Sequence, residues 1–390
     1  MADEVRYREA GPDARLAGGQ LTIDLRALQA NYRALSRIAG KAHTAGVVKA
    51  DAYGLGAEAV VPALVEAGCD TFFVALPTEG IAVREAAPKA RIYVLGGLFG
   101  REAAEVYAEA ALVPVINTRE EAAIWEAVGH AGGKPWPCAI HVDTGMNRLG
   151  LTMAEARALA EENALTGALR PVLIMSHLAC ADEREHPQNR LQLEAFRAVR
   201  ALFSGVPASL ANSAGIVLGR DFHFDMVRPG IALYGGSPGG RTGMHPVATT
   251  AARIVQIRHA AAGETVSYGA TVTLERATII AVASAGYADG LHRALSGSGV
   301  PLRAASAAGG QGFVHGRRVP ILGRITMDLT MFDVTELGDG ALAVGDTIEL
   351  FGPNILLDEA AAAAGTISYE LLTSMGRRFH RSYVSNDDEA

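Results

Sequence analysis

Short apolar runs alternate with longer amphipathic segments between residues 22 and 235, which is the pattern of successive strand–helix units. Helices are predicted over 118–129 and 186–203, and Thr118 with Glu121 three residues later forms a capping-box sequence at the start of the first. Eight short apolar runs are predicted strands: 46–50, 71–76, 91–97, 112–117, 137–143, 171–178, 208–213 and 224–234. Eight such units favour a (β/α)8 TIM barrel, an α/β fold.

A doubly wound open sheet is the alternative to a barrel. Its usual mark is a Gly-rich dinucleotide-binding turn after the first strand, where this chain has VVKADAYG at 47–54. The barrel is therefore the favoured interpretation.

The pattern changes after a Gly/Pro/Ser-rich stretch at 235–246. Turn residues then separate runs that resemble antiparallel strands, and a short helical element follows. The strand runs are 252–258, 277–283, 318–322 and 346–351, and the helical element comprises Ala-rich 358–365 followed by 367–376. We therefore expect a barrel domain over 20–244 and a mainly antiparallel β domain over 245–390, with residues 1–19 as an N-terminal segment that could pack on the β domain.

Composition narrows the class of protein. Charged residues make up 20% of the 390 residues and hydrophobic ones 49%, and the formal net charge is −7. This balance argues against a nucleic-acid or anionic-membrane partner, and neither a membrane span nor an apolar leader is recognisable, so a cytoplasmic enzyme is expected. Cys69, Cys138 and Cys180 are far apart, which predicts reduced thiols and no structural metal.

Lysine is rare, with only Lys41, Lys49, Lys89 and Lys134 among the 35 basic residues. Lys49 ends the first predicted strand, and the active sites of barrels lie at the carboxyl ends of their strands. A strand-end lysine often only extends its ammonium group into solvent. Here, however, other strand ends are polar as well: they carry Asp143, Arg148, Ser176, His177, Asn212, Ser213 and Arg228, followed by Pro229, Gly230 and Ile231. Such a rim suits an anion such as phosphate.

From about Leu21 to Tyr383 the chain resembles the alanine racemases, pyridoxal-phosphate (PLP) enzymes of fold type III. The motifs that carry the resemblance are VVKADAYG (47–54), DTGMNRLG (143–150), SHLACADE (176–183), ANSAG (211–215), VRPGIALYG (227–235), VSYGATV (266–272), GYADG (286–290), GRITMD (323–328) and SYELLTSMG (368–376). The family has a PLP-binding barrel followed by a β domain, in agreement with the predicted division.

The resemblance implies two catalytic bases, Lys49 toward D-alanine and Tyr268 toward L-alanine, with Lys49 also carrying PLP. Arg228 would face the pyridine nitrogen and His177 would contact the tyrosine. The cofactor-binding residues implied are Lys49, Tyr53, Arg148, His177, Asn212, Ser213, Arg228, Gly230, Ile231 and Tyr369, and the substrate-binding residues are Arg148, Tyr287 and Met327.

Two positions depart from the family pattern. Many members have a carbamylated lysine seven residues before the arginine that corresponds to Arg148, and this chain has His141 there. Histidine forms no such carbamate, so another group or a bound anion must orient Arg148. Thr326 stands where cysteine is frequent.

The implied function is interconversion of L- and D-alanine, for peptidoglycan supply or for alanine catabolism, by a homodimer whose active sites are shared between subunits. Alternatives are a racemase for serine or other small amino acids, a basic-amino-acid decarboxylase, and a non-catalytic PLP-homeostasis protein. Decarboxylases place a carboxylate where Arg228 stands, and homeostasis proteins lack the second domain.

Overall fold

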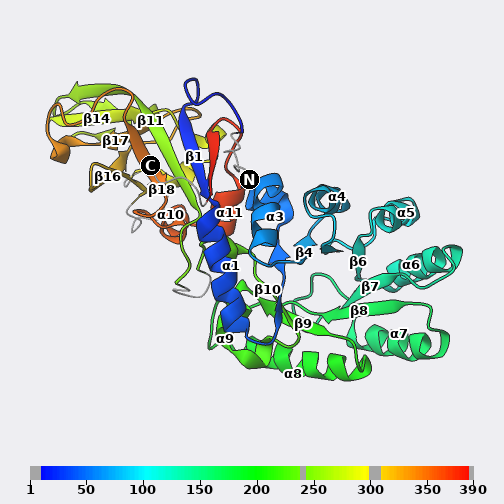
Figure 1. Ribbon diagram of the computed structural model, residues 1–390. Coiled ribbons are helices and arrows are strands. Elements are labelled where there is room, and N and C mark those ends of the chain that lie inside the picture. The colour runs from blue at the N-terminus through cyan, green and yellow to red at the C-terminus, as the bar shows by residue number, and fades with distance from the viewer. Residues whose placement is uncertain (1–9, 238–242, 298–308, 386–390) are drawn as a thin grey trace. The chain divides into compact units, whose positions relative to one another are not determined.

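The computed structural model describes residues 10–237, 243–297 and 309–385 (Figure 1). The chain forms two compact units. One comprises residues 29–233 and 237–244, and the other comprises residues 1–28, 234–236 and 245–390. We call them the barrel and the β domain.

Nine strand segments form the parallel sheet of the barrel: β2 (His43–Thr44), β3 (Gly46–Val47), β4 (Thr71–Val74), β5 (Arg91–Val94), β6 (Val113–Ile116), β7 (Pro137–His141), β8 (Arg170–Met175), β9 (Ala208–Asn212) and β10 (Met226–Arg228). Segments β2 and β3 are halves of one strand on either side of Ala45, whose N–H donates to the carbonyl of Val227 at 3.0 Å. Because β2 pairs with β10 and β3 pairs with β4, the sheet closes. All eight predicted strands are present, and the TIM-barrel prediction is confirmed.

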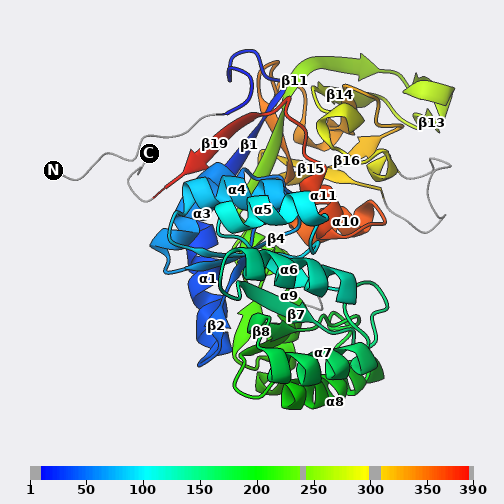
Figure 2. The same cartoon turned by 90° about the vertical axis from the view of Figure 1, so that its right-hand side faces the viewer.

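Helices α3 to α8 lie outside the strands (Figures 1 and 2). The helices of this part of the chain are α1 (Leu25–Ala39), α2 (Lys49–Tyr53), α3 (Ala57–Glu66), α4 (Pro77–Ala86), α5 (Arg101–Glu109), α6 (Arg119–Ala131), α7 (Met153–Thr166), α8 (Pro187–Leu202) and α9 (Ser213–Leu218). As predicted, Thr118 Oγ caps α6 by accepting from the N–H of Glu121 at 3.1 Å.

The predicted strands run past the observed strand ends, and two of these differences concern the site residues. Strand β3 ends at Val47 and Lys49 begins α2, whereas the prediction continued to residue 50. Strand β10 ends at Arg228, because Pro229 has no N–H to continue the ladder, and Ile231–Tyr234 form a 3₁₀ turn where the prediction continued to residue 234. Both differences fall where the chain leaves the barrel wall.

The β domain is built on an eight-stranded, mainly antiparallel sheet. Its strands are β1 (Gly19–Asp24), β11 (Ala248–Ala260), β14 (Thr278–Ala283), β15 (Gln311–Val314), β16 (Arg317–Leu322), β17 (Thr330–Asp333), β18 (Thr347–Phe351) and β19 (His380–Val384), with α10 (Leu357–Ala363) and α11 (Ser368–Thr373) following β18. Residues 20–28, assigned to the barrel from the sequence, belong to this domain because β1 pairs with β11 and β19.

The barrel strands are buried on both faces, as parallel strands covered by helices should be. All four residues of β4 are buried, and the rings of Phe73 and Tyr93 stack at 4.7 Å. Among the described residues, none of the helices combines the length and apolar character needed to cross a bilayer.

Candidate active site

Lys49 stands at the start of a left-handed turn. Ala50, Asp51 and Ala52 have φ angles of 53°, 54° and 53°, and Tyr53 follows with 58°. A left-handed helical residue that is not glycine costs about 1–2 kcal/mol. Such a run is maintained only where its surroundings define it, and strained segments of this kind cluster at functional sites.

The surroundings of Lys49 favour its neutral amine. The side chain is half-buried, and burial lowers its pKa below the ordinary value; the positive charge of Arg148 lowers this pKa further, while Glu79 opposes the shift. A lysine with a lowered pKa can act as a base nearer to neutral pH.

His141, which ends β7, is held in one tautomer. Asn117 donates from Nδ2 to the carbonyl of Val115 at 2.9 Å, so its Oδ1 faces His141 Nδ1 at 2.8 Å and accepts the Nδ1 proton. The imidazole is 7% exposed, and burial, followed by the charges of Arg228 and Arg148, lowers its pKa to about 4. His141 is therefore neutral near pH 7, with an acceptor lone pair on Nε2.

Arg148 lies in the loop after β7, and Asp143 shapes this loop. The Asp143 carboxylate accepts from the N–H groups of Gly145, Met146 and Asn147 at 2.8–2.9 Å. Arg148 itself is exposed and has no hydrogen-bond or ion-pair partner within residues 10–237, 243–297 and 309–385. The sequence placed both loop residues at the barrel rim, and the structure agrees.

Arg228 is a buried cation below this rim. It donates to Ser209 Oγ at 2.5 Å and to the carbonyl of Ser176 at 2.6 Å, and burial lowers its pKa to about 9. His177 follows β8 nearby, and its pKa is held well below the ordinary value by burial and then by the charge of Arg228. The two side chains thus combine a fixed cation with a neutral imidazole.

Tyr53, Ser213, Gly230 and Ile231 come together on the buried side of the rim. The Gly230 N–H donates to Ser213 Oγ at 2.8 Å, and a Cβ at Gly230 would lie 2.2 Å from the Tyr53 hydroxyl. The N–H of Ile231 has no partner among the described residues, although Ile231 is fully buried. A close-approach glycine beside an unpaired buried N–H is a suitable cradle for an anion.

Two other residues expected to bind the cofactor have structural contacts here. Asn212 Oδ1 accepts from the N–H of Gly215 at 2.9 Å and caps α9. Tyr369 belongs to α11 of the β domain and is half-buried, and its carbonyl accepts from Thr373 Oγ at 2.8 Å.

The remaining predicted residues form a cluster on the surface of the β domain. Tyr268, Tyr287 and Met327 have exposed fractions of 72%, 44% and 53%. Their loops are joined: the Tyr287 N–H donates to the carbonyl of Thr326 at 3.0 Å, and Ser267 Oγ donates to the carbonyl of Arg324 at 2.7 Å. We call Tyr268, Tyr287 and Met327 the β-domain cluster.

The chain matches family models in both halves. The model "Alanine racemase, N-terminal domain" matches residues 23–238, and "Alanine racemase, C-terminal domain" matches residues 247–383. The chain belongs to the alanine racemase family.

Relatives within the alanine racemase family are similar over nearly the whole chain. The alanine racemase of Rhizobium meliloti is 53% identical over 96% of this chain and 98% of its own length. The biosynthetic alanine racemase of Agrobacterium fabrum is 52% identical over 95% and 94%. The crystal structure of the Bartonella henselae enzyme, described with covalently bound pyridoxal phosphate, is 38% identical with a TM-score of 0.87 and covers 94% of this chain and 100% of that one.

PLP, the cofactor of alanine racemases, fits the residues present in the barrel. Lys49 offers a primary amine, the Gly230 region offers a glycine that Tyr53 approaches closely beside an unpaired N–H, and Arg228 offers a buried cation. A primary amine can condense with an aldehyde, a backbone N–H can bind a phosphate, and a guanidinium can donate to an unprotonated ring nitrogen.

Sequence reasoning missed Glu79. Its Oε1 accepts from the N–H of Ala50 at 2.7 Å, and its Oε2 accepts from Ala75 at 2.7 Å and from Leu76 at 3.0 Å. Half of a capping box was available as a local signal, since a glutamate at the third helical position can accept from the N–H of the N-cap residue, as Glu79 does from Leu76, although a leucine there offers no acceptor in return. Its contact with the turn after Lys49 is long-range and has no local signature.

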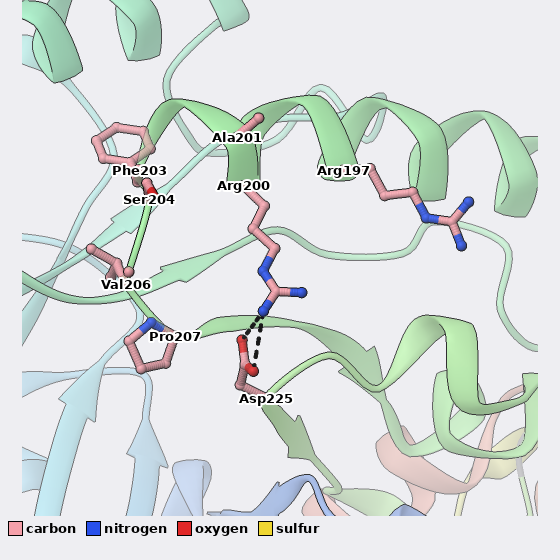
Figure 3. A pocket seen from close by; sticks show the side chains of 9 residues that line it. Arg197, Arg200, Ala201, Phe203, Ser204, Val206, Pro207 and Asp225 are labelled. Carbon is pink, nitrogen blue, oxygen red and sulfur yellow. Dashed lines mark hydrogen bonds and ion pairs between the residues drawn. The ribbon is translucent and has the colours of Figure 1, made fainter.

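A hollow lies at the opposite end of the barrel strands, beside the residues that precede β9 and β10. Figure 3 shows Arg200 directed at Asp225, with which it forms an ion pair at 3.1 Å. Because the cation is already paired and barrel chemistry occurs at the other end of the strands, we do not assign a ligand here. The hollow is lined by Arg197, Arg200, Ala201, Phe203, Ser204, Gly205, Val206, Pro207 and Asp225.

Proposed function

We propose that this protein is a PLP-dependent alanine racemase that interconverts L- and D-alanine with Lys49 and Tyr268 as the two bases. The observation that carries the proposal is Lys49, half-buried with a lowered pKa at the end of the first barrel strand, in a chain that belongs to this family throughout. When bound, PLP supplies the electron sink that makes the α-proton of an amino acid removable.

Lys49 takes or returns the α-proton on the D-alanine side. Its surroundings favour the neutral amine that this role needs, because burial and Arg148 both disfavour the ammonium form. Arg148 is exposed at the rim, where its guanidinium would bind the substrate carboxylate.

Arg228 would hold the pyridine nitrogen of PLP and His177 would lie beside the ring. A fixed cation at that nitrogen opposes its protonation and so limits electron withdrawal, which favours proton return over transamination. Asn212 and Tyr369 remain proposed cofactor residues, beside Tyr53, Ser213, Gly230 and Ile231 for the phosphate.

His141 would take over part of the role of the family's carbamylated lysine. Its Nδ1 proton is committed to Asn117, and its neutral Nε2 can accept a hydrogen bond from Arg148. A neutral acceptor in place of an anionic carbamate would hold Arg148 more weakly, which leaves the guanidinium freer to reach a substrate carboxylate.

The β-domain cluster supports a homodimer with shared active sites. Exposed aromatic and methionine side chains are typical of interfaces, and Tyr268 must meet a lysine-bearing barrel to act as the second base. In an isologous dimer, each β domain can supply Tyr268, Tyr287 and Met327 to the partner's barrel. We place the enzyme in the cytoplasm, where its three free cysteines would stay reduced.

One experiment tests the reaction and the lysine together. The purified protein is reduced with borohydride, and its peptides are mapped; a pyridoxyl group is expected on Lys49 and on no other lysine. A parallel chiral assay with L-alanine should give D-alanine in unreduced enzyme only. Label on Lys41, Lys89 or Lys134, or absence of D-alanine, would overturn the proposal.

A further inference from the structure

The turn that follows Lys49 is strained and needs an external support. Within the turn, the N–H of Ala52 donates to the carbonyl of Val48 at 2.9 Å, and that of Gly54 donates to the carbonyl of Ala50 at 2.7 Å. Asp51 Oδ1 ties the far end by accepting from the N–H of Ala57 at 2.7 Å. At the near end, the N–H of Ala50 donates to Glu79 Oε1 at 2.7 Å.

The Glu79 carboxylate uses both oxygens as acceptors for backbone N–H groups. One oxygen binds Ala50, and the other binds Ala75 and Leu76 at the start of α4. Three N–H donors are better served by a carboxylate than by an amide, because an amide nitrogen would face at least one of these donors. The end of β3 and the start of α4 are therefore joined through one negative charge.

This charge also acts on the lysine itself. Three causes shift the pKa of Lys49: burial and the charge of Arg148 lower it, whereas the charge of Glu79 raises it. His177 is also close to Lys49, since the lysine charge contributes to the lowered pKa of His177. A histidine carries no negative charge, so it does not share the effect of Glu79 on Lys49.

Resting on the proposed function of Lys49, we propose that Glu79 is its positioning residue: the carboxylate clamps the left-handed turn through Ala50 and places a negative charge at the strand end that carries Lys49. The clamp holds the backbone from which the Lys49 side chain extends, and the charge favours the ammonium form of that side chain against burial and Arg148. Glu79 does not act on the substrate directly.

The barrel provides a matched control in Glu121. It occupies the same third position of α6, and its two oxygens accept from the N–H groups of Asn117 at 2.6 Å and Leu98 at 3.1 Å. It therefore joins the ends of β5 and β6 as Glu79 joins those of β3 and β4. The loop that Glu121 holds contains no lysine.

The test compares Glu79→Gln with Glu121→Gln in two measurements. In protein freed of PLP, trace acetylation at increasing pH, followed by peptide mass spectrometry, gives the pH midpoint of Lys49 reactivity, with Lys41, Lys89 and Lys134 as internal references. In PLP-loaded enzyme, hydrogen exchange reports the Ala50 amide. For Glu79→Gln we expect the Lys49 midpoint to fall below that of the wild type and exchange at Ala50 to rise about tenfold. Glu121→Gln should change neither.

A third variant separates charge from reach. Glu79→Asp keeps the charge but shortens the side chain, so exchange at Ala50 should rise while the Lys49 midpoint stays closer to the wild-type value than it does in Glu79→Gln. If Glu79→Gln fails to fold, this variant still tests the clamp, and unchanged exchange at Ala50 would refute it.

Any other result for a folded Glu79→Gln overturns the proposal. If the pH midpoint of Lys49 reactivity does not move, the charge of Glu79 does not act on Lys49. If hydrogen exchange at the Ala50 amide does not change, Glu79 does not clamp the turn. If Glu79→Gln and Glu121→Gln have equal effects, both effects reflect the general stability of the barrel. Failure of the proposed function has a different signature, because borohydride mapping would then place no pyridoxyl label on Lys49 whatever residue 79 is.

Discussion

At the scale of single residues, positive charge dominates the barrel rim. Burial is the main cause of the lowered pKa values of His141 and Lys49, and positive charge adds to it: Arg228 and Arg148 act on His141, and Arg148 acts on Lys49. His141 and His177 are therefore neutral near pH 7, and Arg148 and Arg228 supply the positive charge at the rim. A site of this kind binds phosphate and carboxylate groups while leaving a lysine amine able to accept a proton.

The neutral state of His141 predicts a pH-dependent loss of stability. Its pKa is lowered from 6.5 to about 4, so as the pH falls below 6.5 the unfolded chain takes up a proton that the folded protein refuses. Stability is lost between these values and not above 6.5. At pH 5 the loss from this group is about 2 kcal/mol relative to pH 7.

Urea denaturation at pH 7 and pH 5 checks this, with the wild type compared with His141→Gln. The variant should lose about 2 kcal/mol less between the two pH values. His130→Gln, which removes an exposed histidine at the end of α6, is the control and should behave as the wild type does. Equal losses in all three proteins would show that His141 is not held neutral.

Gly230 predicts a specific loss of cofactor affinity. In Gly230→Ala the new methyl group would stand 2.2 Å from the Tyr53 hydroxyl, so Tyr53 must move out of the proposed phosphate cradle. We expect PLP affinity, measured by titrating cofactor-free protein, to fall at least about tenfold. Adding Tyr53→Phe to this variant should cost little more, because the hydroxyl is already displaced. Fully additive losses would place Tyr53 and Gly230 in separate roles.

At the scale of elements, the barrel is fastened by glutamates at the third position of α4 and α6. Each bridges the end of its own strand to the end of the preceding one. Two neighbouring strand ends are thereby held in register by one carboxylate, at the end of the barrel where chemistry takes place.

The barrel strands, the helices near 118–129 and 186–203, and four of the eight strands of the β-domain sheet could be predicted because their signals are local: apolar runs, capping residues and turn residues. The left-handed turn after Lys49 could not, since Ala50 and Ala52 are ordinary helix formers and only the distant Glu79 reveals the constraint. The placement of β1 in the β domain was missed for a similar reason, because its partners β11 and β19 are far away in the sequence.

The turn predicts opposite effects for the same substitution at two alanines. Ala50 has a φ of 53°, so Ala50→Gly relieves strain and should leave the free energy of unfolding unchanged or raise it by up to about 1 kcal/mol. Ala59 lies in the right-handed helix α3, and Ala59→Gly should lower it by about 1 kcal/mol. Urea denaturation measures both. Equal destabilisation would mean that the turn is not left-handed in solution.

At the scale of the whole molecule, the two proposed bases belong to different folding units. Lys49 is in the barrel, whereas Tyr268 is on the surface of the β domain with most of its side chain exposed. The proposed role of Tyr268 requires that a lysine-bearing barrel lie against this exposed surface. The proposed two-fold dimer would bring the barrel of a second copy to it without a further protein.

The shared-site dimer predicts rescue between two inactive variants. Lys49→Ala and Tyr268→Phe should each be nearly inactive alone. If the two are unfolded together and refolded at equal concentrations, about half of the dimers contain one chain of each kind. Each mixed dimer has one site with both native bases and one with neither, so total activity should recover to about a quarter of the wild-type value. If one chain supplied both bases of a site, every site in the mixture would lack one of them. Absence of recovery in dimers verified as mixed, by native mass spectrometry of differently tagged chains, would therefore exclude sharing of the site between subunits.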